Sequence, residues 1–230
     1  MKFDIITLFP DVIEPYAKAS ILGRAQVKKL IKISAHDLRK FSKNKHKSVD
    51  DTPYGGGPGM LMTVQPIDSA VRKVRNKLGK KKTRVILTAA NGKMFTQSDA
   101  KRLAKFEQLI FVCGRYEGID HRVEEAVADE VFSVGEYVLT GGELPALIMT
   151  DAIARNVPGV LGEEASLESE SYNQTGVLEY PQYTKPEIYK FKEGLGSKEL
   201  KVPSVLLSGN HAKIAQWRTK QSEIRSESTK

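Results

Sequence analysis

Two glycine-rich segments and one lysine-rich run are the parts of this sequence whose residue types could do chemistry. The pair Gly141-Gly142 separates a strand-like stretch from an apolar stretch in which Pro145 lies where a helix tolerates proline, in its first turn. A strand, a glycine turn and a buried helix form a corner at which an α/β protein holds a ligand against bare backbone. An ordinary strand-to-helix connection has the same pattern, so this segment alone leaves both interpretations open.

The second glycine-rich segment covers residues 49–60, VDDTPYGGGPGM. Its four glycines and two prolines exclude a helix or a central strand. It lacks the Gly-Lys-Ser/Thr ending of a phosphate-binding P-loop, and its glycines do not fit G-x-G-x-x-G. Asp50 and Asp51 precede the glycines and Met60 to Met62 follow them, which favours an ordered loop near a site over a flexible turn.

Basic residues dominate the charge of the chain. The formal net charge is +8 and the sequence pI is about 9.4, which favours a polyanionic partner. The run 39–47 contains five Lys or Arg and no acid. Such a run is usually a solvated loop, but beside a substrate channel it would bind phosphate.

Several classes of protein are excluded by composition. The single Cys113 rules out an intramolecular disulfide framework and every multi-cysteine zinc motif, and it is expected to be a small buried hydrophobe. The four histidines show no metal-ligand spacing. The chain begins with no signal peptide, and no apolar run approaches the roughly 20 residues of a membrane span. We expect a soluble cytoplasmic protein.

The elements that position these segments alternate along the first 160 residues. Apolar runs predict strands at 3–9, 31–35, 84–89, 109–113 and 131–139, and helical spacing predicts helices at 11–30, 66–78, 96–106 and 145–155. Alternation of this kind predicts a mainly parallel sheet covered on both faces. The last helix is apolar almost all round, so we expect it to be buried against the sheet or a partner subunit.

The sequence changes character after Gly162. Residues 163–176 are acidic and rich in serine, which is typical of a mobile linker. From Val177 the chain is basic again, and residues 202–217 predict a turn followed by a helix capped by Ser208 or Asn210. We therefore expect a smaller, mainly helical domain at 177–230.

Four segments together are more specific than any of these patterns. They read VDDTPYGGGPGML at 49–61, CGRYEGID at 113–120, SVGEYVLTGGELPA at 133–146 and VPSVLLSGNHAKIAQWR at 202–218. In this order they closely resemble the bacterial tRNA (guanine-N1)-methyltransferase family TrmD, which belongs to the SPOUT superfamily. The resemblance extends from Phe3 to about Ser222, nearly the whole chain.

The resemblance implies a fold and an activity. The fold is an α/β SPOUT-type parallel sheet with a deep trefoil knot in its C-terminal part, plus a small helical C-terminal domain. The implied domains are a knotted methyltransferase domain at 1–162, a flexible linker at 163–176 and a tRNA-binding domain at 177–230. Composition and periodicity do not show the knot, because threaded chains are very rare. The implied enzyme is a homodimer that transfers a methyl group from S-adenosyl-L-methionine to N1 of the guanosine at position 37 of tRNA, next to the anticodon.

The family's cofactor positions carry over to a set of mostly glycine and apolar residues. Glycines expose backbone N–H and C=O groups that can bind the edge of a flat, uncharged adenine, and apolar side chains can cover its faces. This favours the ligand interpretation of the Gly141-Gly142 corner. The implied cofactor-binding residues are Leu87, Thr88, Ala89, Gly114, Glu117, Val134, Gly135, Glu136, Tyr137, Val138, Leu139, Gly141, Gly142 and Pro145.

Methylation of guanine N1 also needs a base that removes the N1 proton and a cation that stabilises the charge on O6. The family's arginine aligns with Arg155, and its general base, usually Asp, aligns with Glu170, with Glu168 as a possible substitute. The alternatives are an i, i+4 ion pair of Arg155 with Asp151, and a merely solvated linker acid at Glu170.

The resemblance also implies a role for Asp50 in ordering the tRNA or a Mg²⁺ ion, although no ligand cluster in the sequence proves it.

The chain departs from the family pattern at three further places. Lys185 stands where the family has Arg, so a bidentate phosphate contact becomes a point charge. The turn at residues 88–92 is one residue longer than in the family, and about eight extra residues fall between Glu187 and Val202. Two rival hypotheses are open: a tRNA-binding protein that lost efficient chemistry through the exchange of Asp for Glu170, and a SPOUT enzyme that acts on ribosomal RNA, against which the Gly-rich loop and the helical C-terminal domain argue.

Overall fold

The computed structural model describes residues 1–75, 82–162, 170–172, 176–193 and 196–228. The chain divides into two compact units, Met1–Gly162 and Glu163–Lys230. Each unit is described by itself below. No helix among the described residues is long and apolar enough to cross a bilayer.

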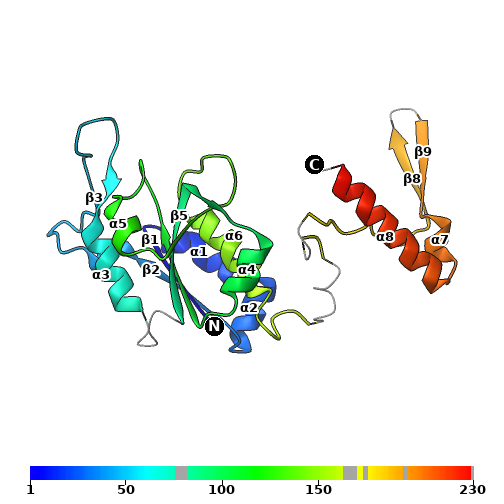
Figure 1. The fold of residues 1–230 in the computed structure, drawn as a ribbon, viewed down its shortest axis with the longest axis horizontal. Coiled ribbons are helices and arrows are strands. Elements are labelled where there is room, and N and C mark those ends of the chain that lie inside the picture. Colours follow the sequence, from blue (N-terminus) through cyan, green and yellow to red (C-terminus); the bar gives the residue numbers. More distant parts are fainter. Residues whose placement is uncertain (76–81, 163–169, 173–175, 194–195, 229–230) are drawn as a thin grey trace. The chain divides into compact units, whose positions relative to one another are not determined.

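The first unit is built on a five-stranded sheet in which every pair of neighbouring strands is parallel. The strand order is β2-β1-β6-β5-β7 (Figure 1). This confirms the parallel sheet predicted from the alternating elements. The strands are β1 (Lys2–Thr7), β2 (Lys32–Asp37), β5 (Thr83–Met94), β6 (Gln108–Cys113) and β7 (Glu130–Ser133).

Helices cover both faces of this sheet, so its strands are apolar on both sides. Successive residues of β1 show this, since Ile5 belongs to one buried cluster and Ile6 to the other. One face packs against α1 (Pro10–Ala17), α2 (Ser20–Val27), α4 (Gln97–Leu103) and α6 (Glu143–Ala154). The other packs against the 3₁₀ helix η1 (Leu38–Phe41), α3 (Val64–Val74) and α5 (Arg122–Ala126).

Most predicted elements have bounds that differ by a few residues in the structure, and three elements differ more. The helix predicted at 11–30 is two helices, because the backbone turns after Ala17 and Ser20 adopts a φ of 43°. The strand predicted at 131–139 ends at Ser133, whose hydroxyl accepts from the N–H of Gly135 and so turns the chain out of the sheet. The strand predicted at 84–89 continues to Met94 after an interruption described below.

Helix α6 begins two residues before the predicted start at Pro145 and is not buried all round. It ends at Ala154, just before Asn156, and most of its side chains are buried against the sheet and its neighbouring helices. Leu144 and Ile148, one turn apart, are exposed. Helix α1, which contacts α6, also has exposed apolar side chains.

The glycine-rich segment at 49–60 joins two short paired strands. β3 (Asp50–Asp51) pairs antiparallel with β4 (Leu61–Met62), which fixes both ends of the loop. Four glycines of the loop have φ between +79° and +121°, the region in which only glycine is unstrained. The loop conformation therefore depends on glycine.

The described part of the second unit contains a β-hairpin and two helices. β8 (Ile188–Glu193) pairs antiparallel with β9 (Gly196–Lys201), and α7 (Ser204–Leu207) and α8 (His211–Glu227) follow. Asn210 caps α8, because its side chain accepts from the N–H of Lys213 at 3.1 Å. The expectation of a mainly helical unit did not include the hairpin, which occupies the extra residues between Glu187 and Val202. Most of the predicted linker lies outside the described residues.

Candidate active site

A cavity of about 420 Å³ opens at the carboxyl ends of β5, β6 and β7. Its wall comes from the last residues of these strands, the segments that follow them and the first turn of α6. Open parallel sheets bind ligands at this edge, and the volume lies in the range of small-molecule sites. The cavity is the candidate site of the first unit.

Twelve of the fourteen residues predicted to bind the cofactor line this cavity, and Gly135 and Glu136 do not. Their role in cofactor binding stays a prediction. Sequence reasoning did not single out several other lining residues, although most of them stand inside the four quoted segments or next to them. They include Ala90, Asn91, Arg115, Tyr116, His121, Glu124, Phe132 and Thr140.

Gly142 brings the start of α6 into contact with the strand ends. Its N–H donates to the carbonyl of Gly114 at 2.8 Å. A Cβ at this position would lie 2.0 Å from Oγ1 of Thr88 and 2.8 Å from Cα of Cys113. Only glycine fits there, so this residue closes one wall of the cavity by backbone contact alone.

A cluster of polar side chains around the buried Glu143 supports the same wall. Glu143 is 1% exposed, and its two carboxylate oxygens accept from the hydroxyl of Thr7 at 2.6 Å and from Nε of Arg115 at 2.9 Å. The guanidinium of Arg115 also donates to the carbonyl of Thr140 at 3.1 Å and lies 4.5 Å from the ring centroid of Phe9. The group therefore links β1, the segment after β6 and the segment before α6.

The interruption of β5 forms another part of the wall. Thr88 and Lys93 both pair with Phe132 of β7, so residues 89–92 bulge out of the sheet, and Ala89, Ala90 and Asn91 line the cavity. A Cβ on Gly92 would lie 2.7 Å from the backbone of Phe132. The turn at residues 88–92, which we expect to be one residue longer than in the family, contains this bulge.

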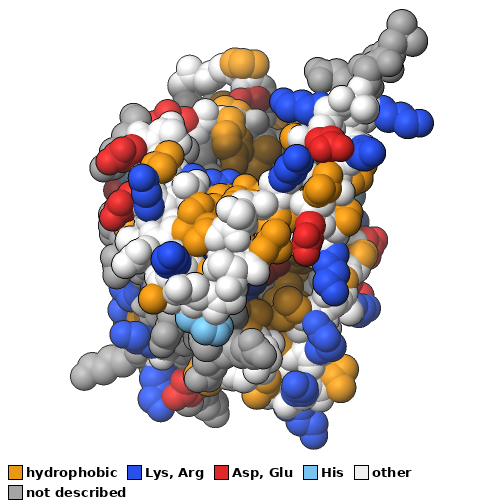
Figure 2. All heavy atoms as spheres, turned by 90° about the vertical axis from the view of Figure 1, so that its right-hand side faces the viewer, with side chains coloured by type: hydrophobic (Ala, Val, Ile, Leu, Met, Phe, Trp, Pro, Cys, Tyr) orange, Lys and Arg blue, Asp and Glu red, His pale blue; other side chains and the backbone are white. Residues whose placement is uncertain are grey.

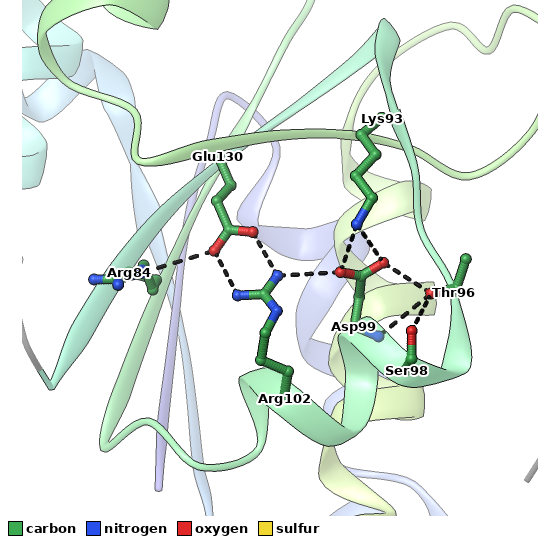
Figure 3. Close-up of polar contacts among 7 residues, drawn as sticks. All are labelled: Arg84, Lys93, Thr96, Ser98, Asp99, Arg102 and Glu130. Atoms are coloured by element: carbon green, nitrogen blue, oxygen red, sulfur yellow. Dashed lines mark hydrogen bonds and ion pairs between the residues drawn. The ribbon is translucent and has the colours of Figure 1, made fainter.

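A charged network holds the bulge from the side of α4 (Figure 3). Asp99, at 3% exposure, contacts Nζ of Lys93 at 3.0 Å and Nη2 of Arg102 at 3.1 Å. Arg102 also pairs with Glu130, the first residue of β7. The network thus joins α4 to the part of β5 that follows the bulge and to the start of β7. Its members are Arg84, Lys93, Thr96, Ser98, Asp99, Arg102 and Glu130.

The charges in this network shift the pKa of its central residue. Burial raises the pKa of the Asp99 carboxyl, but hydrogen bonds from Lys93, Thr96 and Arg102 lower it, and the net pKa is below its usual value. Asp99 is therefore an anion at neutral pH, and its role is to hold the bulge in place.

Cys113 lies at the end of β6 and is fully buried. Burial raises the pKa of its thiol well above the usual value, and the charge of Glu143 adds to this. The thiol is therefore neutral at physiological pH. The expectation of a small buried hydrophobe at this position is confirmed.

The glycine-rich loop ends against the cavity wall. Glu117 N–H donates to the Met60 carbonyl at 3.1 Å and Met62 N–H to the Gly118 carbonyl at 3.0 Å. A Cβ on Gly59 would lie 2.3 Å from the side chain of Glu117. The loop is therefore in direct contact with the segment that lines the cavity.

The two predicted catalytic residues lie in different units. Arg155 is the half-buried residue that caps the C-terminus of α6, in the first unit. Glu170 belongs to the second unit and is also half-buried, and Glu168 lies outside the described residues. Asp151, the alternative partner of Arg155, accepts a hydrogen bond from the hydroxyl of Tyr16. Both catalytic assignments stay predictions.

Asp50, in β3, was the candidate for ordering Mg²⁺. Among the described residues, no group of three or more His, Cys, Asp or Glu side chains comes together in a way that could hold a metal ion. These residues do not by themselves form a magnesium site.

Comparison with known proteins places this chain in one family. A relative from Bacillus subtilis is 47% identical over 222 residues, which cover 96% of this chain and 87% of the relative. A relative from Pelotomaculum thermopropionicum is 49% identical over 225 residues, with 98% and 86% covered. One from Heliobacterium modesticaldum is 46% identical over 227 residues, with 96% and 80% covered.

All three relatives carry the name tRNA (guanine-N(1)-)-methyltransferase. The sequence profile of the family described as tRNA (Guanine-1)-methyltransferase TrmD matches residues 1–230. This chain therefore belongs to the TrmD family of tRNA (guanine-1)-methyltransferases.

Proposed function

We propose that this enzyme transfers a methyl group from S-adenosyl-L-methionine to N1 of the guanosine at position 37 of tRNA. The observation that carries the proposal is the cavity at the carboxyl ends of β5, β6 and β7, in a chain of the TrmD family. When bound, S-adenosyl-L-methionine supplies an electrophilic methyl group. The chain must then bind the cofactor, hold the guanine and remove its N1 proton.

The cavity suits this cofactor in shape and chemistry. Its glycine corner exposes the backbone of Gly114, Gly141 and Gly142, and Leu87, Val138 and Leu139 add apolar surface. Backbone groups can bind the edge of adenine while apolar side chains cover its faces. The carboxylates of Glu117 and Glu124 also line the cavity and would favour the positive end of the molecule.

Two side chains would perform the chemistry on guanine. The Glu170 carboxylate would accept the N1 proton, because N1 becomes a good nucleophile only as that proton leaves. The Arg155 guanidinium would stabilise the negative charge that then develops on O6. Glu170 is one methylene longer than the Asp usual in the family, and such a change in position costs rate unless the surrounding chain compensates.

We also propose the trefoil knot and the domain bounds implied by the family. After the edge strand β7 the chain returns over the sheet, where α6 contacts β6, β1, α1 and α4, a path that supports a knot. The proposed domains are 1–162 for methyl transfer and 177–230 for tRNA binding, joined by 163–176. Limited proteolysis tests this division, since cleavage within 163–176 should release a stable N-terminal fragment.

We propose that the enzyme works as a homodimer. Exposed apolar side chains on the contacting helices α1 and α6 support this, because exposed apolar surface of this kind marks an interaction surface. Ile148→Glu should convert the dimer to a monomer in sedimentation equilibrium. The residues concerned are Phe9, Val12, Tyr16, Leu144 and Ile148.

The tRNA substrate would be held by basic residues. Every lysine in the run 39–47 is exposed. Lysines at the surface neutralise phosphates. A cytoplasmic location follows from the tRNA substrate. No step of this mechanism uses Mg²⁺, and activity measured in EDTA, with and without added Mg²⁺, tests whether the ion is needed.

Methyl incorporation tests the reaction directly. Two tRNA transcripts that differ only in guanosine or adenosine at position 37 are incubated with labelled S-adenosyl-L-methionine. Label is expected in the guanosine transcript alone. Label in ribosomal RNA fragments instead would favour the ribosomal enzyme, and cofactor binding without any label would favour the tRNA-binding protein with weak chemistry.

A further inference from the structure

The β8–β9 hairpin is the element of the second unit that neither the helical expectation nor the methyl-transfer mechanism explains. Every side chain described between Ile188 and Lys201 is exposed, so neither face of the hairpin is covered by the described residues of its own unit. A two-stranded hairpin alone is only marginally stable in water. Its open faces therefore call for a partner.

The pairing register divides the side chains between two faces. Tyr189 is opposite Leu200, and Phe191 is opposite Lys198, so these four side chains share one face, called here the aromatic face. Tyr189 is 56% exposed and Phe191 48%. Among the described residues neither ring has an aromatic or cationic partner, whereas Tyr183 stacks against Trp217, and Arg218 lies over Tyr180. The hairpin rings are thus available for a ligand.

Lysines lie on both faces of the hairpin, and Lys198 is the one on the aromatic face. Residues 188–201 contain four lysines and two glutamates. On the opposite face Glu199 lies 3.9 Å from Lys190 and 3.5 Å from Lys201, so one carboxylate is shared by two ammonium groups. Within the described residues, Lys192 and Lys198 take part in no ion pair. On the face that Figure 2 draws, Lys and Arg side chains are interspersed with hydrophobic ones in the same way.

This combination matches RNA better than a second copy of the chain. Exposed aromatic rings stack unpaired bases, and lysines beside them neutralise phosphates. A two-fold contact through the aromatic face would bring Lys198 of each copy toward the other, and like charges in an interface are unfavourable. The net positive charge of the hairpin is complementary to a polyanion.

We propose that the β8–β9 hairpin is a tRNA-binding element, in which Tyr189 and Phe191 stack an unpaired base and Lys198, on the same face, contacts a phosphate. The proposal rests on tRNA being the substrate, as proposed above. The hairpin would add affinity for tRNA without touching the reacting atoms.

Three variants of the full-length chain test it. Tyr189→Ala/Phe191→Ala removes the rings, and Lys198→Ala removes the charge beside them. Ile188→Ala is the matched control, because Ile188 is also 48% exposed but lies on the opposite face. The measurements are the Kd for a tRNA transcript at several salt concentrations, the Kd for S-adenosyl-L-methionine, and the KM and kcat of methyl transfer.

The ring variant should raise the Kd and KM for tRNA roughly tenfold, the effect expected for loss of one stacked base. The lysine variant should reduce the slope of log Kd against log salt by about 0.7 for each lost phosphate contact. Ile188→Ala should stay within about twofold of the wild type. All three variants should keep the wild-type cofactor Kd, because no residue of the hairpin lines the cavity.

The outcomes separate this proposal from the function on which it rests. If the wild-type enzyme does not methylate tRNA, the proposed function fails. If it does and the ring variant binds tRNA with the wild-type Kd, only the hairpin proposal is overturned. An unchanged tRNA Kd with an altered sedimentation coefficient would assign the aromatic face to a contact between copies, and an equal loss in Ile188→Ala would overturn the choice of face.

Discussion

The guanidinium of Arg115 and the carboxylate of Glu143 form a buried ion pair, with Nη2 and Oε2 2.8 Å apart. Arg115 follows β6, and Glu143 begins α6. Arg115 also holds the carbonyl of Thr140, so the pair fixes the segment between β7 and α6 that lines the cavity. The pair therefore fixes the backbone of this segment, which we propose binds the cofactor.

Arg115→Ala should therefore reduce both stability and cofactor binding. It leaves the Glu143 carboxylate buried without its cation, which costs about 3 kcal/mol in the free energy of unfolding. The Kd for S-adenosyl-L-methionine should rise in parallel, as measured by calorimetry. Lys82→Ala is the control, because it breaks an exposed pair with Glu107 that is worth less than about 1 kcal/mol. Equal losses in the two variants would contradict the structural role of the buried pair.

Gly142→Ala should abolish cofactor binding. The new Cβ would approach Thr88 and the backbone of Cys113 within 2.8 Å, so the start of α6 must move away from the cavity wall. Gly162→Ala is the matched control, since a Cβ there meets nothing within 4 Å. Calorimetry with S-adenosyl-L-methionine compares the two, and wild-type affinity in Gly142→Ala would show that this wall takes no part in binding.

The local patterns of the sequence predicted the strands and the buried helix because each depends on neighbouring residues. The apolar run 109–113 and the helical spacing after Pro145 each identify an element without reference to the rest of the chain. The bulge at 89–92 could not be predicted, because it exists only through the pairing of both Thr88 and Lys93 with Phe132. The Arg115–Glu143 pair likewise joins residues far apart in sequence, and no local periodicity indicates such a contact.

The hairpin shows a different limit. Ile188 to Glu193 alternates apolar and charged residues only in part, and both faces are exposed, so no buried face gives the strong period-two signal of a strand. The Gly141-Gly142 corner, in contrast, could be recognised from the sequence. Gly141 and Gly142 were singled out for their backbone, and both line the cavity.

Stability should fall at acid pH through Asp99. Its pKa in the folded protein is below the usual 3.8, so the unfolded state binds the proton more readily. The contribution of Asp99 is thus fully present above pH 4 or so and is lost as the pH falls through its lowered pKa. Urea unfolding between pH 3 and pH 7 should show a smaller decrease in Asp99→Asn than in the wild type. Asp68→Asn, at a more exposed pair with Arg72, should behave like the wild type.

Cys113 should resist alkylation in the folded enzyme. The thiolate is the reactive form, and burial keeps the pKa of this thiol well above its usual value. Iodoacetamide at pH 8 should leave the native chain unmodified by mass spectrometry and modify it once in urea. Fast modification of the native chain would mean that the carboxyl end of β6 opens, and added S-adenosyl-L-methionine should then slow the reaction.

Substitutions at Glu170 test the proposed base. Glu170→Gln keeps the size of the side chain but cannot accept the N1 proton, so kcat should fall by about 10² to 10⁴, with the Kd values for cofactor and tRNA unchanged. Glu170→Asp restores the residue usual in the family and should keep much of the activity. Glu168→Gln is the matched control in the same segment. A loss of kcat in Glu168→Gln, with wild-type rates in Glu170→Gln, would identify Glu168 as the base. Full activity in both single variants would exclude each of them as the sole base.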